Sequence, residues 1–268
     1  MPELPEVEVT RLQLKPYLEG QQIQSVVVGD KQLRYSFPEI LYDWHPVKLI
    51  ELDRVGKYLI FKFDHGNLYW HFGMTGHLRI EPIGTILKKH DHVVVQTEFH
   101  AIHYHDPRRF GFMIWQDLKQ PVPDGVKRLG KDPMKGLEIA DINRLCDTNS
   151  KMIKSQLLNQ SLITGIGNIY ACESLFLANI HPKKIASTLS DQEKERLLMA
   201  IDKTLKLAIS KGGSSLKDFK SPLGNIGYFP MIANVYNRNQ QPCSVCQTLI
   251  KKIIIEQRST FFCENCQV

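Results

Sequence analysis

The sequence lacks any long apolar run and has few cysteines outside its carboxyl end. No stretch approaches the ~18 uncharged apolar residues of a membrane span, and no apolar leader precedes a cleavage site. These absences favour a cytosolic protein. Four of the six cysteines lie in the last 26 residues, and in a cytosolic protein such pairs bind metal more often than they form disulfides. Cys146 and Cys172 stand alone and are expected to pack as small apolar groups.

Excess positive charge is absent from the first half of the chain. Residues 1–150 carry 19 basic against 20 acidic residues, whereas residues 151–268 carry 15 against 8. The net charge of +6 therefore arises in the second half, as expected if that half binds a polyanion. General solubility is the other explanation, and a charge count does not separate the two. The length of 268 residues suits two domains.

Hydrophobic periodicity divides the chain into a strand-rich and a helix-rich part. A first helix is predicted to end at Gly20, and from about residue 22 to 116 apolar and polar residues alternate as in β-strands. Residues 120–136 concentrate proline, glycine and charge and are predicted to form a linker. From about residue 137 to 210 the apolar residues recur with the spacing of an α-helix. We expect a helix and a β-sandwich, then helices and a short hairpin that bears cysteines.

The four terminal cysteines form the strongest self-contained motif, Cys243-x2-Cys246-x16-Cys263-x2-Cys266. Each pair makes a tight knuckle with two thiolates, and two knuckles complete a tetrahedral zinc site. Because four thiolates leave no position for a catalytic water, the ion is expected to be structural. Unligated thiols are the alternative. A zinc hairpin alone specifies no function, since such ribbons bind DNA, RNA or protein.

The amino terminus carries the main candidate for chemistry. Removal of Met1 would leave Pro2 with a secondary amine, which titrates near ~8 and is partly a neutral nucleophile at neutral pH. Glu3 and Glu6 are candidate proton donors beside it. The opening is also typical of a helix start, with Pro5 in the first turn and acidic side chains at the positive end of the helix.

Turns that contain glycine are candidate nucleic-acid contacts. Residues 106–111 (DPRRFG) carry two cations and Phe110, which could wedge between bases, and residues 71–76 (HFGMTG) present Met74 in a similar way. A solvated hairpin or core packing is the alternative for both turns. Residues 165–170 (GIGNIY) open a helix and either bind a phosphate or only cap the preceding helix.

Taken together and in order, the motifs resemble those of the bifunctional DNA glycosylase/AP lyases of the formamidopyrimidine-DNA glycosylase type. The match covers almost the whole chain: PELPEVE at 2–8, the Gly56-Lys57 strand, HFGMTG, KHDH at 89–92, DPRRFG, IKSQLLNQ…GIGNIY at 153–170, GGSSLKDF at 212–219 and the four-cysteine finger. The resemblance implies an α+β fold: an N-terminal catalytic β-sandwich with flanking helices (1–120), a linker (121–136), a helix–two-turns–helix DNA-binding domain (137–230) and a zinc-finger β-hairpin (235–268).

The resemblance also implies residue roles. Pro2 would attack C1′ of the damaged nucleotide and form a Schiff base, Glu3 would assist sugar opening, and Glu6 would support proton transfers. Lys57 would be a proton donor near the sugar and phosphate, and Arg258 would hold phosphates and assist the second elimination. The residues that would fill and wedge the gap left by the flipped nucleotide are Met74, Arg108 and Phe110, and those that would position the DNA backbone are His90, Arg109, Lys151, Lys154 and Asn168.

We therefore expect a monomeric base-excision-repair enzyme that acts on damaged duplex DNA with one structural zinc ion and no organic cofactor. It would remove oxidised purines, 8-oxoguanine and formamidopyrimidines, and nick the strand by β,δ-elimination. An endonuclease VIII-like enzyme for oxidised pyrimidines and a non-catalytic lesion-binding protein are the alternatives. The opening LPEV and the wedge residues favour the purine enzyme, and the presence of Pro2, Glu3 and Lys57 argues against a mere binder.

Several positions around the finger depart from the family pattern. Asparagine or glutamine stands where the family often has glycine, at Asn237, Asn239, Gln247 and Gln257. We expect these changes to affect the tilt of the finger and hence the placement of Arg258.

Overall fold

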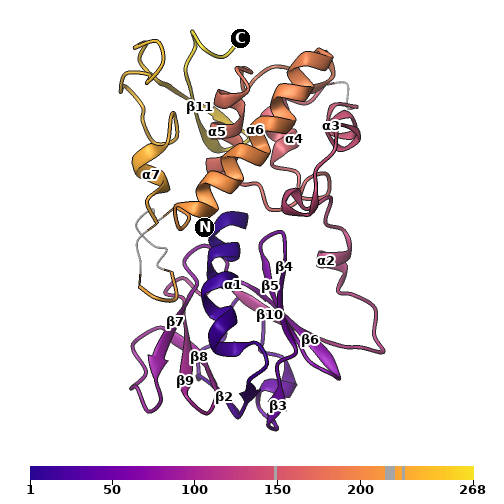
Figure 1. Ribbon diagram of the computed structural model, residues 1–268, viewed down its shortest axis with the longest axis vertical. Helices are drawn as coiled ribbons and strands as arrows, with labels where there is room; N and C mark the ends of the chain where they lie inside the picture. Colours follow the sequence, from indigo (N-terminus) through magenta and orange to yellow (C-terminus); the bar gives the residue numbers. More distant parts are fainter. Residues whose placement is uncertain (148–149, 215–220, 225–226) are drawn as a thin grey trace. The chain divides into compact units, whose positions relative to one another are not determined.

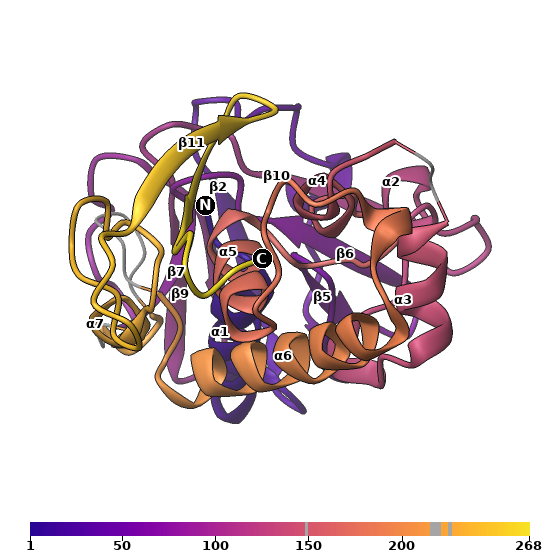
Figure 2. The same ribbon diagram turned by 90° about the horizontal axis from the view of Figure 1, so that it is seen from above.

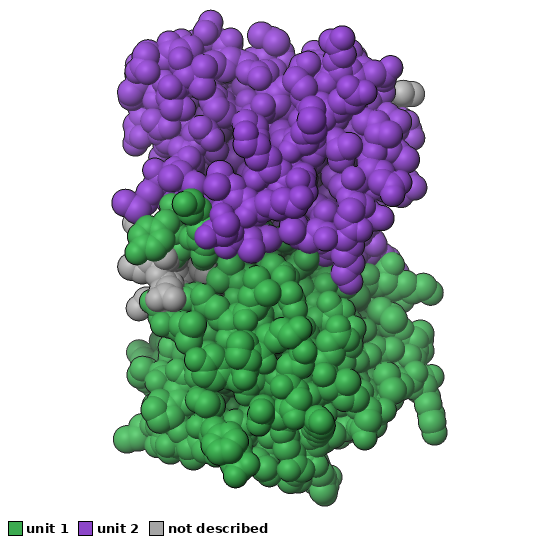
Figure 3. All heavy atoms as spheres, viewed as in Figure 1, with its two compact units in different colours: residues 1–127, 211–228 green, residues 128–210, 229–268 purple. Residues whose placement is uncertain are grey.

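The computed structural model describes residues 1–147, 150–214, 221–224 and 227–268 (Figure 1). Contacts divide the chain into unit 1, residues 1–127 and 211–228, and unit 2, residues 128–210 and 229–268 (Figure 3). The predicted helix–two-turns–helix domain runs to residue 230, whereas the described residues 211–214, 221–224 and 227–228 group with unit 1. The Ser214 backbone N–H donates to Glu6, and the Ile80 N–H donates to the Pro222 carbonyl.

Unit 1 contains two four-stranded antiparallel sheets, and the predicted α+β class with an N-terminal β-sandwich is confirmed. One sheet has the order β10 (Phe112–Asp117), β6 (Gly66–His71), β5 (Tyr58–Lys62), β4 (Glu51–Val55). The other has the order β2 (Ser25–Val28), β8 (Asp91–Gln96), β9 (His100–His105), β7 (His77–Pro82). The described residues of unit 1 also form helices α1 (Leu4–Leu18) and α2 (Asp124–Lys127), a 3-10 turn (Glu39–Leu41) and the strand pair β1 (Gln22–Ile23) with β3 (Val47–Lys48).

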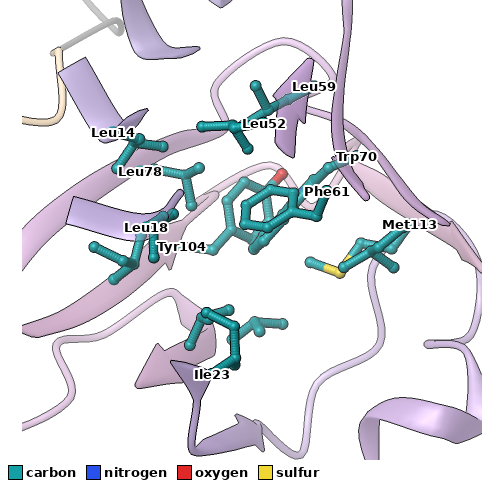
Figure 4. Packing of buried hydrophobic residues seen from close by; sticks show 14 of the residues in the cluster. Leu14, Leu18, Ile23, Leu52, Leu59, Phe61, Trp70, Leu78, Tyr104 and Met113 are labelled. Atoms are coloured by element: carbon teal, nitrogen blue, oxygen red, sulfur yellow. The ribbon is translucent and has the colours of Figure 1, made fainter. Parts of the chain in front are cut away.

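The core of unit 1 follows from the period of two along its strands. Leu59 and Phe61 of β5, with Trp70 of β6, face one side of the first sheet, and Tyr104 of β9 faces them from the second sheet (Figure 4). Leu14 of α1 belongs to the same cluster. Each such side chain stabilises the fold by roughly 1.5–3 kcal/mol when it is fully buried. This packing fixes the turns at the strand ends, where the candidate functional residues lie.

Unit 2 consists of helices and one β-hairpin. Its helices are α3 (Ile139–Cys146), α4 (Ile153–Leu157), α5 (Asn168–Leu177), α6 (Asp191–Ser210) and α7 (Phe229–Ile232), with 3-10 turns at Pro133–Lys135 and Ala186–Thr188. Helix α6 runs beside α5 (Figure 2). The hairpin joins β11 (Lys251–Ile255) to β12 (Arg258–Phe262). It packs on α5, since Phe261 and Ile250 share a buried cluster with Cys172 and Phe176.

The segment predicted as a linker, residues 120–136, contains the short helix α2 and the turn Pro133–Lys135. Elements this short carry no measurable periodicity, so composition alone did not reveal them. The motif at 212–219 is described only as far as Ser214, and its remainder lies outside the described residues.

Candidate active site and nucleic-acid interface

The amino terminus of unit 1 forms a buried carboxylate cluster. Pro2 is buried, while Met1 before it is 45% exposed. Glu3 is the N-cap of α1 and forms a capping box with Glu6, whose Oε2 accepts from the Glu3 backbone N–H at 2.8 Å. The other oxygen of Glu6 accepts from the Ser214 N–H at 2.7 Å. The same residues therefore start the helix and gather two acidic groups beside Pro2.

A buried arginine ties the turn that precedes Lys57 to helix α1. Arg54 donates from Nε to Glu8 at 2.8 Å and from Nη1 to the carbonyl of Gly56 at 3.0 Å. Gly56 has a φ of 56°, which a side chain would strain. Lys57, directly after it, is almost fully buried. Arg54 is not among the residues predicted from the sequence, although it occupies an inward position of β4, two residues after buried Leu52.

Two turns of unit 1 present the predicted wedge side chains, and we call residues 72–76 and 106–111 the wedge turns. Met74 is 39% and Phe110 42% exposed, so both apolar side chains reach the surface. Arg108 stacks on Phe110 with its guanidinium carbon 4.7 Å from the ring centroid. The two turns are in close contact, because a Cβ at Gly73 would overlap the backbone of Phe110.

Two predicted DNA-backbone contacts, His90 and Arg109, have left-handed backbone conformations, and Arg109 belongs to the second wedge turn. His90 has a φ of 75° and Arg109 a φ of 56°. Desolvation and the nearby charge of Lys89 lower the pKa of His90 below its ordinary value. Arg109 is exposed, and its Nη1 donates to the carbonyl of Gln32 at 3.4 Å. Arg109 therefore lies at the surface of unit 1, whereas His90 is half-buried.

In unit 2, Lys154 links the first residue of α5 to strand β12. Its Nζ donates to Oδ1 of Asn168 and to Oγ1 of Thr260, both at 2.6 Å. The amide of Asn168 donates in turn to the carbonyl of Ser259 at 2.8 Å. Lys154 is 0% exposed, whereas Lys151 is exposed. In this arrangement Lys154 orients Asn168 and β12 and does not reach the surface itself.

The four predicted metal ligands converge in unit 2. The Sγ atoms of Cys243, Cys246, Cys263 and Cys266 lie within 4.8 Å of one another, and no other such group of three or more His, Cys, Asp or Glu occurs among the described residues. Four thiolates at this separation fit a tetrahedral zinc ion. Arg258, at the start of β12, is exposed.

Three of the four positions where the family often has glycine have the backbone conformation that favours glycine, and Asn239 is the exception. Asn237, Gln247 and Gln257 have φ values of 61°, 64° and 61°, and Glu256 has 46°. Positive φ at both Glu256 and Gln257 makes the two-residue turn that matches strand twist. The hairpin keeps its register, with Ile255 opposite Arg258. The replacements therefore retain the left-handed turns that glycine would supply at lower cost.

Models of protein families match the chain in three consecutive segments. Residues 1–113 match the formamidopyrimidine-DNA glycosylase N-terminal domain, residues 129–220 the H2TH domain of that enzyme, and residues 240–268 a zinc finger found in FPG and IleRS. Fold and cysteine site thus define a zinc-finger protein of the helix–two-turns–helix class.

Individual relatives match over the full length. A formamidopyrimidine-DNA glycosylase from Herminiimonas arsenicoxydans is 43% identical over 272 residues and 100% of both chains. The complex of a Lactococcus lactis FPG mutant with Fapy-dG containing DNA matches with a TM-score of 0.90, 32% identity and 99% of each chain. The complex of Lactococcus lactis Fpg with an abasic site containing DNA gives the same values. The chain belongs to the formamidopyrimidine-DNA glycosylase family. None of the helices among the described residues is long and apolar enough to cross a membrane.

Proposed function

We propose that this protein is a base-excision-repair DNA glycosylase that removes oxidised purines from duplex DNA and then cleaves the strand at the abasic site. The observation that carries the proposal is the buried amino-terminal cluster, in which Pro2 precedes the capping pair Glu3 and Glu6. Family membership supports it, as do the matched complexes with DNA that contains Fapy-dG or an abasic site.

The proposed chemistry requires that Met1 is removed, so that the Pro2 nitrogen is a free secondary amine. This nitrogen bonds to C1′ as the bond from C1′ to the base breaks, and the base leaves with the electron pair. Glu3 supplies the proton for sugar opening, and Glu6 and Lys57 assist later proton transfers. Once the nitrogen has lost its proton, its lone pair breaks the C1′–O4′ bond, O4′ takes the proton from Glu3, and the resulting iminium acidifies C2′. Loss of a C2′ proton expels the 3′-phosphate, and a second elimination expels the 5′-phosphate with help from Arg258.

The proposed DNA contacts divide into a wedge and a set of backbone contacts. Met74, Arg108 and Phe110, which we call the wedge set, fill the gap left by the flipped nucleotide and offset the cost of unstacking it. Contacts to phosphates come from His90, Arg109, Lys151 and Asn168. Lys154 acts through Asn168 and the β12 backbone, because its own side chain is fully buried. We also propose one structural zinc ion held by the four cysteines, no organic cofactor, and a monomer that acts in the cytoplasm.

Borohydride trapping on a duplex that contains 8-oxoguanine tests the proposal. We expect a covalent adduct, with mass spectrometry placing the mature amino terminus and the adduct at Pro2. The Pro2→Gly variant should lose the adduct. No adduct with the wild type, or an adduct that survives Pro2→Gly unchanged, would refute the mechanism. A matched thymine-glycol duplex separates the lesion classes, since faster excision from it would replace oxidised purines by oxidised pyrimidines as the substrate.

A further inference from the structure

The wedge turns connect the two sheets of unit 1. One follows β6 and leads into β7, and the other follows β9 and leads into β10. Because β6 and β10 belong to one sheet and β7 and β9 to the other, both turns cross between the sheets. Asp106, at the first position of the second turn, is 0% exposed and belongs to neither the chemistry nor the DNA contacts proposed above.

The carboxylate of Asp106 accepts from both wedge turns. Oδ1 accepts from the Thr75 hydroxyl, and Oδ2 accepts from the Gly111 backbone N–H at 2.8 Å. Oδ2 also accepts from the Tyr104 hydroxyl at 3.2 Å. Burial and the Asp106 carboxylate raise the pKa of Tyr104 well above its ordinary value, so this hydroxyl keeps its proton and donates. One buried acid thus receives a hydrogen bond from each wedge turn and one from strand β9, which precedes the second turn.

Thr75 also connects Asp106 to the backbone of Arg108. Its Oγ1 donates to Asp106 and accepts from the Arg108 N–H at 3.3 Å. Thr75 directly follows Met74, so a single hydroxyl joins the residue after Met74 to the backbone of Arg108. Its side chain is 7% exposed and is not among the proposed DNA contacts.

The backbone of Asp106 also connects the wedge turns to a third turn, which contains His90. Its N–H donates to the carbonyl of His90 at 3.0 Å, and its carbonyl accepts from Nε2 of His92 at 2.9 Å. The carbonyl also accepts from the Arg109 N–H at 3.2 Å, which closes the turn that carries the wedge residues.

We propose that Asp106 is a positioning residue that holds the two wedge turns as one rigid body, with Thr75 as the connection between them. The wedge set then enters the base stack as a unit, and little side-chain and loop freedom is lost on binding. The inference rests on the proposed function, because it requires that the wedge set enters a duplex. A purely structural role for Asp106 would affect stability but would not separate wedge insertion from the chemistry at Pro2.

The test compares three variants. Thr75→Val removes the hydroxyl at nearly constant shape, and Thr75→Ser keeps it. Tyr104→Phe removes the hydrogen bond from strand β9 to the same Asp106 carboxylate. The first readout is the fluorescence of 2-aminopurine opposite a tetrahydrofuran abasic analogue at saturating full-length protein, since this signal reports insertion without any cleavage. Thr75→Val should lose most of the fluorescence rise, while Thr75→Ser and Tyr104→Phe should keep it. The second readout compares single-turnover excision from a paired 8-oxoguanine duplex with trapping on a preformed abasic site.

We expect Thr75→Val to slow excision about tenfold while trapping on the preformed site stays near the wild-type rate. A wild-type fluorescence rise in Thr75→Val would overturn the proposal, as would an equal loss in Tyr104→Phe. If the wild type inserts but never excises or traps, the proposed function fails while the fluorescence comparison still decides the role of Asp106.

Discussion

At the scale of single residues, the guanidinium of Arg54 bonds Glu8 of α1 and the carbonyl of Gly56 at once. It thereby connects the helix that begins behind Pro2 with the turn that precedes Lys57. Glu8 has a second partner, Arg11, at 2.7 Å. The two arginines differ in burial, since Arg54 is 4% and Arg11 20% exposed. They form a matched pair for testing what the Arg54 contact contributes.

We predict that Arg54→Met lowers the free energy of unfolding by about 3 kcal/mol, because it leaves a largely buried carboxylate with one partner. The rate of borohydride trapping at saturating DNA should fall as well, since the Lys57 turn loses its link to α1. Arg11→Met, the control, should cost about 1 kcal/mol or less and leave trapping unchanged. Urea unfolding and single-turnover trapping provide the two measurements, and equal effects of both variants would contradict the prediction.

The same contact makes stability depend on pH. Burial raises the pKa of Glu8, but hydrogen bonds from Arg11 and Arg54 outweigh it, so the pKa lies below its ordinary value of 4.5. A carboxyl with a depressed folded-state pKa stabilises the fold above its unfolded-state pKa, and the contribution is lost as pH falls through the folded-state pKa. The difference in the free energy of unfolding between wild type and Arg54→Met should therefore have its full value at pH 7 and decrease below about pH 4. Urea titrations at a series of pH values check this, and a difference that grows in acid would disprove it.

Lys151 and Lys154 are three positions apart but should affect DNA binding differently. Lys151→Ala removes an exposed cation and should reduce the slope of log affinity against log salt by about 1. Lys154→Met removes a buried ammonium that holds Asn168 and Thr260, so affinity should fall while the salt slope stays constant. Fluorescence anisotropy with a tetrahydrofuran duplex at several salt concentrations measures both. A reduced slope in Lys154→Met would mean that this lysine contacts phosphate directly.

At the scale of elements, the zinc knuckles support the hairpin that carries Arg258. Cys243 and Cys263 lie in the cluster that packs β12 on α5, together with Val235 and Phe261. The Thr260 hydroxyl receives the Lys154 bond and donates to the carbonyl of Arg258 at 3.2 Å. Loss of the metal should therefore disturb the finger and the Lys154 connection together.

We predict that removal of zinc by a chelator abolishes binding to the tetrahydrofuran duplex but leaves tryptophan emission unchanged. All three tryptophans, Trp44, Trp70 and Trp115, lie in unit 1, so their emission reports that unit alone. Anisotropy and emission are measured on the same sample, and added zinc should restore binding. A shift in emission upon chelation would show that the metal also supports unit 1, and retained binding would show that the finger is dispensable.

The sequence predicts the elements whose pattern is local. The helix start at Glu3 and Glu6, the strands of period two and the paired cysteines all depend on spacings of a few residues, and the expected helix with a β-sandwich, followed by helices and a hairpin, rests on them. The contacts that arrange the candidate site join distant residues: Arg54 lies 46 positions from Glu8, Thr75 31 from Asp106, Lys154 106 from Thr260 and Ser214 208 from Glu6. No local pattern specifies such partners, so only the folded chain reveals them.

At the scale of the whole molecule, cations that would hold DNA occur in both compact units. Arg109 lies on a wedge turn of unit 1, and Lys151 lies before α4 of unit 2. Both side chains are exposed, and the described residues show no hydrogen bond between them. Substitutions that share no interaction partner are expected to be additive. A double substitution therefore tests whether both units bind one DNA duplex at the same time.

We predict that Arg109→Ala and Lys151→Ala each reduce the salt slope for tetrahydrofuran DNA by about 1, and that the double variant reduces it by about 2. The reason is that each phosphate contact releases its own counterions, so simultaneous contacts add. Lys203→Ala, which removes an exposed lysine of α6, is the control and should leave the slope unchanged. Anisotropy titrations across a salt series measure all four proteins. If the double variant lost no more slope than either single variant, the two units would engage DNA alternately, and a repair mechanism that needs the Pro2 cluster and the Arg258 hairpin on one lesion would have to be abandoned.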